Sequence, residues 1–223
     1  MERLSSPSPH PAQTLREAAL RDSVLRVGVL GGSFDPPHVG HLILAEEARD
    51  QLGLDRVLFA PAGRQPLKQG QPVTAAEDRV RMTELAIADN ASFALSRGDV
   101  DRPGPHYTVD LIAIIAAQLP PDAELYFLMG FDSLRDLPKW RQPEKLIRIA
   151  RLVALTRPDI AIDWEALEKA LPGVRERIRL LDMPELEIAS RDLRERVRTG
   201  RSIRYMVTDT VRAYIEEKGL YRK

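Results

Sequence analysis

The sequence predicts an α/β fold: a Rossmann-like doubly wound parallel sheet with helices on both faces and a small C-terminal helical segment. Two observations predict it. Short apolar runs alternate with segments of helical periodicity from Val24 to about Lys218, a pattern typical of βαβ units. The apolar runs are also continuous rather than alternating with polar residues, as expected for strands buried on both faces. Right-handed crossovers then place helices on both sides of the sheet.

The elements are predicted in chain order from these runs. Six strands are expected over 24–30, 56–60, 93–95, 125–129, 152–155 and 178–181. Helices are expected from near Val39 to the stop at Gly53, and over 74–89, 107–119, 143–150, 163–171, 192–199 and 209–218. Thr74 and Glu77 match a capping box, and Gly219 suits a helix C-terminus.

The chain is expected to form one domain over 24–223, preceded by a flexible N-terminal tail over 1–23. The tail is rich in serine and proline and has little hydrophobic periodicity. No internal repeat and no linker divides the rest of the sequence, so a second domain is not predicted.

The composition excludes several classes of protein. The 223 residues contain 33 basic and 33 acidic side chains, so no overall charge recruits nucleic acid or an anionic membrane. The absence of cysteine excludes a disulfide scaffold, an iron–sulfur cluster and a cysteine nucleophile. No segment approaches the roughly 18 apolar residues of a membrane span, and the N-terminus lacks the apolar run of a signal peptide. We therefore expect a cytoplasmic protein; homo-oligomerisation is compatible with the sequence.

The segment between the first strand and the first helix carries the clearest chemical signal. Residues 31–41 read Gly-Gly-Ser-Phe-Asp-Pro-Pro-His-Val-Gly-His. Two glycines let the backbone approach a ligand closely, and a helix starting near Val39 directs free N–H groups and its positive dipole end toward it. His38 and His41, two of only four histidines, lie on the same helical turn. The segment therefore predicts a phosphate site at the carboxyl edge of the sheet.

Other phosphate and catalytic motifs are absent from the sequence. There is no Gly-x-x-x-x-Gly-Lys-Ser/Thr loop, no Gly-x-Gly-x-x-Gly after the first strand, no His-Glu-x-x-His and no Gly-x-Ser-x-Gly. Kinase, dehydrogenase, metalloprotease and esterase functions are therefore disfavoured.

The 31–41 segment resembles the signature of the bacterial nicotinate-nucleotide adenylyltransferases, which belong to the nucleotidyltransferase superfamily with a His-x-Gly-His motif. Further segments similar to that family are Tyr107-Thr108, 129–134, Lys139-Trp140, 188–194 and 205–221. The resemblance covers about 24–222. It implies an enzyme that transfers the adenylyl group of ATP to nicotinate mononucleotide, with Mg²⁺ bound to the ATP phosphates and no dedicated protein cage for the metal.

The resemblance also implies site residues on the ATP side. His38, His41 and Arg194 are expected to be catalytic. The expected ATP-binding residues are these three together with Gly31, Gly32, Ser33, Gly130, Asp132 and Ser190. Asp132 would accept hydrogen bonds from the adenosine ribose. Ser190 suits a helix N-cap, and Arg194 lies one turn further along, within reach of the triphosphate. Asp35, before two prolines, is expected to hold the turn rather than to bind ligand.

On the acceptor side, the resemblance implies that Lys68, Tyr107, Thr108 and Trp140 bind the mononucleotide. Thr108 would contact the nicotinate carboxylate and Trp140 would stack on the pyridine ring. Three positions depart from the family pattern: Leu67, Ala189 and Arg191.

Alternative functions remain open at this point. A related enzyme could use phosphopantetheine or nicotinamide mononucleotide as acceptor, although Thr108 and Trp140 favour a pyridine carboxylate. A fragment of a class I aminoacyl-tRNA synthetase is disfavoured because the chain has no Lys-Met-Ser-Lys-Ser segment. A non-catalytic nucleotide sensor on the same fold is distinguished from an enzyme only by turnover.

Overall fold

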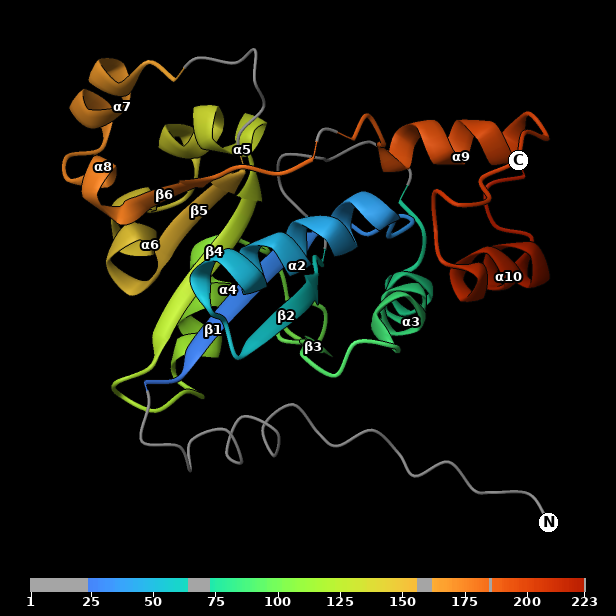
Figure 1. The fold of residues 1–223 in the computed structure, drawn as a ribbon, viewed down its shortest axis with the longest axis horizontal. Coiled ribbons are helices and arrows are strands. Elements are labelled where there is room, and N and C mark those ends of the chain that lie inside the picture. Colours follow the sequence, from blue (N-terminus) through green and yellow to red (C-terminus); the bar gives the residue numbers. More distant parts are fainter. Residues whose placement is uncertain (1–23, 64–72, 156–161, 185, 223) are drawn as a thin grey trace.

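The fold is built on a six-stranded parallel sheet (Figure 1). The computed structural model describes residues 24–63, 73–155, 162–184 and 186–222. The strands are β1 (Arg26–Gly32), β2 (Arg56–Pro61), β3 (Phe93–Leu95), β4 (Glu124–Gly130), β5 (Arg151–Leu155) and β6 (Ile178–Leu181). Their order is β3-β2-β1-β4-β5-β6 and every neighbouring pair is parallel. The predicted fold class is confirmed. The tail expected over 1–23 lies outside the described residues.

The helices are α2 (Val39–Leu52), α3 (Ala76–Ile87), α4 (Thr108–Ala116), α5 (Phe131–Asp136), the 3₁₀ helix η2 (Leu137–Lys139), α6 (Pro143–Ile149), α7 (Trp164–Ala170), α8 (Val174–Arg177), α9 (Ser190–Arg198) and α10 (Asp209–Lys218). Each predicted helix is present; α10 has the predicted ends, and most of the others begin or end one to three residues away from the prediction. Helices α5, η2 and α8 were not predicted, because segments of three to six residues are too short to show helical periodicity.

The core has two halves, one on each face of the sheet. Along β4, Phe127 and Met129 pack into one half with α4, α6 and α7, whereas Tyr126 and Leu128 pack into the other with α2, α3 and α10. This alternation explains the continuous apolar runs, because both faces of each central strand are covered by helices. The strand order reverses between β1 and β4, which places the switch point of the sheet directly after β1.

Two of the three helix ends that the sequence predicts from local motifs are confirmed, and one is wrong. Gly53 and Gly219 end α2 and α10 with left-handed φ values of 61° and 63°, as predicted. The capping box predicted at Thr74 and Glu77 is wrong: α3 begins one residue later, with Ala75 as N-cap and no side-chain cap. The Thr74 N–H instead donates to the Asp35 carboxylate at 3.1 Å, so this residue belongs to the site described below.

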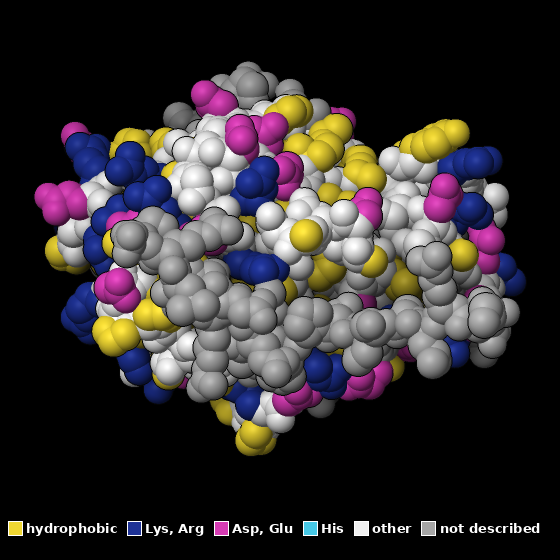
Figure 2. Space-filling model, turned by 60° about the horizontal axis from the view of Figure 1, so that its bottom comes forward, with side chains coloured by type: hydrophobic (Ala, Val, Ile, Leu, Met, Phe, Trp, Pro, Cys, Tyr) yellow, Lys and Arg dark blue, Asp and Glu magenta, His cyan; other side chains and the backbone are white. Residues whose placement is uncertain are grey.

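Charge on the surface is mixed. Figure 2 shows basic and acidic side chains interspersed over the face it draws, in keeping with the equal numbers of the two signs. Among the described residues, no helix has the length and apolar character needed to cross a bilayer.

Candidate active site

The segment 31–41, here called the phosphate loop, joins β1 to α2 at the carboxyl edge of the sheet. The prediction placed Gly31 and Gly32 in the connection after the strand, which is wrong: they are the last two residues of β1, and the phosphate loop therefore begins within the strand. A Cβ on Gly32 would lie 3.0 Å from the Phe34 ring, and one on Gly31 would lie 3.4 Å from Phe127. The glycines therefore let buried aromatic rings pack directly against the backbone that leads into the loop.

His38 and His41 form a stacked pair at the start of α2. His38 is the N-cap residue and His41 the third helical residue. Their ring centroids are 3.7 Å apart with an interplanar angle of 27°. The backbone N–H of His38 donates a hydrogen bond to the ring Nδ1 of His41 at 3.2 Å. The predicted placement of both rings on one helical turn is confirmed.

Burial keeps both imidazoles neutral. Desolvation lowers the pKa of His38 to about 4. Desolvation first, and the charge of His38 second, hold the pKa of His41 well below its usual range. Because His41 Nδ1 accepts a hydrogen bond, the neutral ring carries its hydrogen on Nε2. His41 can therefore donate one hydrogen bond to a phosphate oxygen without carrying a charge.

This burial predicts that the protein loses stability in acid through His38. Between pH 6.5 and about 4 the unfolded chain binds a proton at this residue that the folded chain does not, so the free energy of unfolding falls as the pH falls. The expected loss from pH 7.5 to pH 4 is about 3 kcal/mol. Urea unfolding of the wild type and of His38→Gln at both pH values measures it: the variant should lose less stability by that amount. Equal losses would contradict the neutral, buried state of His38.

The C-terminal segment contacts the phosphate loop from α9. The Arg194 guanidinium Nη1 donates to the Asp35 carbonyl at 2.7 Å. Ser190 was predicted to cap this helix, which is wrong: Ala189 is the N-cap residue, and the Ser190 hydroxyl donates to the Pro36 carbonyl at 2.8 Å. Two of the predicted site residues thus lie against the loop although they follow it by more than 150 residues.

Asp35 is buried, with 2% of its surface exposed, and its carboxylate faces into the protein. Oδ1 accepts from the Tyr221 hydroxyl at 2.7 Å and Oδ2 accepts from the Thr74 N–H at 3.1 Å. The expectation that Asp35 holds the turn agrees with these contacts. Sequence reasoning did not assign Tyr221 a role.

Gly130 and Asp132 follow the neighbouring strand at the same edge. Gly130 ends β4 and is the N-cap residue of α5, and Asp132 is the second residue of that helix. A Cβ on Gly130 would meet nothing within 4 Å, so the space beside it is open. The last pair of the β1–β4 ladder is Leu30 with Leu128, and Gly32 and Gly130 each follow it by two residues. The phosphate loop and Gly130 therefore flank the switch point.

The residues predicted to bind the acceptor lie on the α4 side of this edge. Thr108 is the first residue of α4 and Tyr107 is its N-cap residue. The Arg141 guanidinium lies 6.0 Å from the centre of the Tyr107 ring, which places Tyr107 next to the turn carrying Trp140. The Trp140 ring packs edge-on against Phe127 of β4, with centroids 6.0 Å apart. Tyr107 and Trp140 thus lie near each other, both partly buried against the core.

A buried acid connects the end of β2 to the start of α4. Asp99, with 4% of its surface exposed, accepts from the Gly63 N–H at 2.8 Å and from Arg102 Nη2 at 2.6 Å. Arg102 in turn donates to the Pro105 and Tyr107 carbonyls. Asp99 and Arg102 therefore fix the backbone that presents Thr108 at the edge of the sheet.

Two predicted positions cannot be placed in the structure, and one buried arginine was not predicted. Lys68 and the departure at Leu67 lie outside the described residues. Arg79, which the sequence analysis missed, is buried and donates to the carbonyls of Ser33, Ala62 and Thr74. It lies in a charged stretch of α3 that is typical of an exposed helix face, so the sequence carries no signal for this role.

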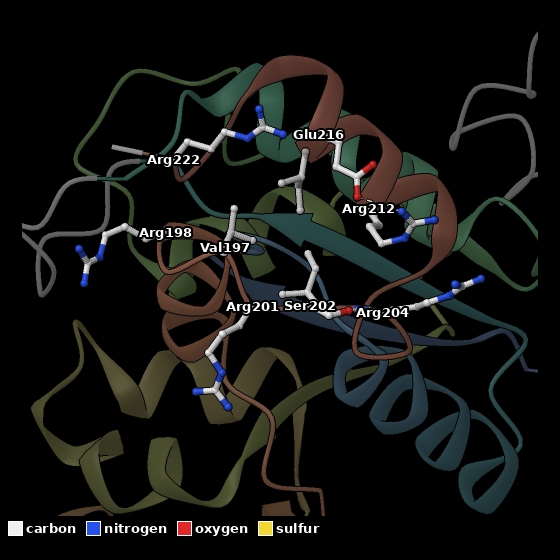
Figure 3. A pocket seen from close by; sticks show the side chains of 11 residues that line it. Val197, Arg198, Arg201, Ser202, Arg204, Arg212, Glu216 and Arg222 are labelled. Carbon is white, nitrogen blue, oxygen red and sulfur yellow. Dashed lines mark hydrogen bonds and ion pairs between the residues drawn. The ribbon is translucent and has the colours of Figure 1, made fainter.

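A cavity of about 670 Å³ lies between α9 and α10, apart from the predicted site residues (Figure 3). Five arginines contribute to its lining: Arg198, Arg201, Arg204, Arg212 and Arg222. Figure 3 shows that their guanidinium groups point in different directions and do not converge on a common centre. Arg198 is paired with Glu195, and Arg212 with Asp209 and Glu216. We assign this cavity no role in the chemistry.

The chain is similar in sequence to known proteins over most of its length. The profile of the cytidylyltransferase-like family matches residues 29–196. A protein of Roseiflexus sp. (strain RS-1), named "Probable nicotinate-nucleotide adenylyltransferase", is 48% identical over 196 residues, which are 88% of this chain and 98% of that protein. A protein of the same name from Thermus thermophilus is 46% identical over 198 residues, covering 89% of this chain and all of that protein.

The fold has a counterpart among solved structures. The nicotinic acid mononucleotide adenylyltransferase of Plasmodium falciparum in complex with NaAD superposes with a TM-score of 0.71 over 88% of this chain and 97% of that one. The sequence identity is 20%, so this likeness supports the fold alone.

Proposed function

Since the chain belongs to the cytidylyltransferase-like family and, within it, to the nicotinate-nucleotide adenylyltransferases, we propose that it joins ATP and nicotinate mononucleotide to form nicotinate adenine dinucleotide and pyrophosphate. This is the adenylyl-transfer step of NAD biosynthesis. The observation that carries the proposal is the stacked His38–His41 pair at the start of α2, at the switch point of a parallel sheet.

The reaction is one displacement at the α-phosphorus of ATP. An oxygen of the mononucleotide phosphate forms the new bond, and the bond to the bridging oxygen of the β-phosphate breaks, so that pyrophosphate leaves with the electron pair. The attacking phosphate is already ionised at neutral pH, and no covalent enzyme intermediate or strong base is needed. The protein has to align the two substrates and stabilise the charge that develops between them.

We assign the ATP phosphates to the phosphate loop. The His41 Nε2–H donates to an oxygen at the reacting α-phosphate, and His38 supports it from the stacked position. Gly32, Ser33 and the first N–H groups of α2 add donors along the triphosphate. Arg194 contributes a planar cation suited to paired phosphate oxygens, and its Nη1 already lies against the loop.

We assign the rest of ATP and the acceptor to the neighbouring strand ends. Gly130 and Asp132, after β4, lie beside the adenosine. Thr108, at the start of α4, contacts the nicotinate carboxylate, and Trp140 stacks on the pyridine ring, with Tyr107 beside it. Lys68 is proposed to contact the mononucleotide phosphate, on the resemblance alone.

Magnesium is proposed to enter with ATP. The part of the chain that the structure describes contains no group of three or more His, Cys, Asp or Glu side chains placed to hold a metal ion. ATP oxygens and water would then supply most of the ligands. The ion would neutralise charge on the triphosphate.

The proposal predicts that purified protein releases pyrophosphate from ATP and Mg²⁺ when nicotinate mononucleotide is present. Because Thr108 is assigned to the nicotinate carboxylate, which nicotinamide lacks, nicotinamide mononucleotide should have a value of kcat/KM at least about tenfold lower, the effect of a lost charged hydrogen bond. Coupled detection of pyrophosphate, with chromatography of the dinucleotide, measures both acceptors, and a chelator in excess of Mg²⁺ should stop release.

Each arm of this experiment separates one alternative. Equal use of the two mononucleotides would leave the chemistry in place but refute the role of Thr108 as the residue that recognises the nicotinate carboxylate. If neither mononucleotide supports pyrophosphate release but phosphopantetheine does, phosphopantetheine would be the acceptor instead of nicotinate mononucleotide. ATP binding without release with any acceptor would indicate a nucleotide sensor.

A further inference from the structure

Tyr221 connects the end of the described chain to the phosphate loop. Its hydroxyl donates to Asp35 Oδ1 at 2.7 Å and lies 3.7 Å from Met82 Sδ. Burial, and then the charge of Asp35, raise the pKa of Tyr221, so the hydroxyl is protonated and can donate at neutral pH. Tyr221 is also held at a φ of 64°, a left-handed conformation that residues other than glycine rarely adopt. The structure therefore holds this donor in a defined position on Asp35.

The carboxylate of Asp35 also has a positively charged neighbour, Arg194. Arg194 Nη1 lies 4.0 Å from Asp35 Oδ2 while it donates to the carbonyl of the same residue at 2.7 Å. A buried carboxylate requires donors, and the loss of one makes an adjacent cation the favoured replacement. Arg79 is less free to move, because its guanidinium donates to three backbone carbonyls. Arg194, with about a third of its side chain exposed, is the cation that could turn toward Asp35.

We propose that the Tyr221 hydroxyl satisfies Asp35 and thereby keeps the Arg194 guanidinium from closing a full ion pair with that carboxylate, leaving it free for the triphosphate of ATP. Tyr221 is thus a positioning residue for ATP binding, acting from the C-terminal segment. The inference rests on the proposed function, in which Arg194 contacts ATP. Its physical basis is a competition between two anions, the Asp35 carboxylate and the triphosphate, for one guanidinium group.

The test uses a tyrosine that makes the same kind of bond elsewhere. The Tyr214 hydroxyl donates to Asp78 Oδ1, also at 2.7 Å, and links α10 to α3 away from the phosphate loop. Tyr221→Phe is expected to raise KM for ATP about tenfold, in line with one hydrogen bond to a charged group, and to leave KM for nicotinate mononucleotide within about twofold. Tyr214→Phe should change neither KM by more than about twofold. Calorimetric titration of ATP supplies a readout that does not need turnover, and should show the same tenfold difference in Kd.

A second variant isolates the competition. Asp35→Asn keeps an oxygen to accept from Thr74 but carries no charge to hold Arg194, so KM for ATP should not rise. In that background, Tyr221→Phe should add no further increase. Should Tyr221→Phe fail to fold, Asp35→Asn still tests the competition: a lower KM for ATP would support the inference, and a tenfold rise would overturn it.

Other outcomes also decide the question. Equal effects of Tyr221→Phe and Tyr214→Phe, a fall in kcat with unchanged KM for ATP, or full additivity with Asp35→Asn would each refute the role of Tyr221. A wild type that binds ATP but forms no dinucleotide would refute the proposed function and leave the ATP titration to test Tyr221. A wild type that does not bind ATP would refute both.

Discussion

Replacing His41 by asparagine is expected to lower kcat for adenylyl transfer by about 10²–10³-fold, the usual effect of removing one donor to a developing charge. In the wild type, the backbone N–H of His38 donates a hydrogen bond to His41 Nδ1 at 3.2 Å. The side-chain oxygen of asparagine can still accept this hydrogen bond. The variant therefore loses mainly the Nε2 donor and keeps the start of α2. Pyrophosphate release at saturating ATP and nicotinate mononucleotide measures the loss.

His41→Ala separates the two roles of this side chain. Alanine removes the phosphate donor and the acceptor for His38 together, so it should be at least as inactive as asparagine and less stable to heat. His106→Asn is a suitable control, because His106 is partly buried and packs over Gly63 instead of the phosphate loop. A His41→Asn enzyme that retained a tenth or more of wild-type kcat would show that His41 does not contact the reacting phosphate.

Replacing Arg194 by alanine is expected to lower kcat/KM for ATP by about 10²–10³-fold, because the triphosphate loses its cation from α9. Arg194→Lys should recover part of this loss, since lysine retains the charge but not the planar pair of donors. The free energy of unfolding should change little in Arg194→Ala compared with the loss in kcat/KM. The Arg194 side chain is partly exposed, and its 2.7 Å hydrogen bond is to a backbone carbonyl. Initial rates over a range of ATP concentrations measure the effect.

The matched control lies on the same helix. Arg198 follows Arg194 by one turn, but its side chain is more than half exposed and pairs with Glu195. Arg198→Ala should alter kcat/KM by less than about twofold. Similar losses in the two variants would mean that α9 contributes only general positive charge, and Arg194 would lose its specific role.

Much of the candidate site could be predicted from the sequence. The phosphate loop was found because its glycines, its paired histidines and the following helix are adjacent in the chain, and local patterns carry such information. The same holds for the ends of α2 and α10, where glycine supplies the left-handed residue. Ser190 shows the limit of this reasoning. Its sequence position suits a helix N-cap, but its hydroxyl donates a hydrogen bond to the carbonyl of Pro36, which is 154 residues away in the chain.

By itself, the sequence determined the parallel α/β class, the strands in their chain order and the motif that we propose binds phosphate, since each depends on residues close together in the chain. Only the tertiary structure decided which strands are neighbours and which distant side chains complete the loop. Asp35 shows why. A carboxylate beside two prolines predicts a turn, but its burial and its partners come from residues 74, 194 and 221. Contacts of this kind depend on how helices pack across the sheet, which periodicity and local propensity do not encode.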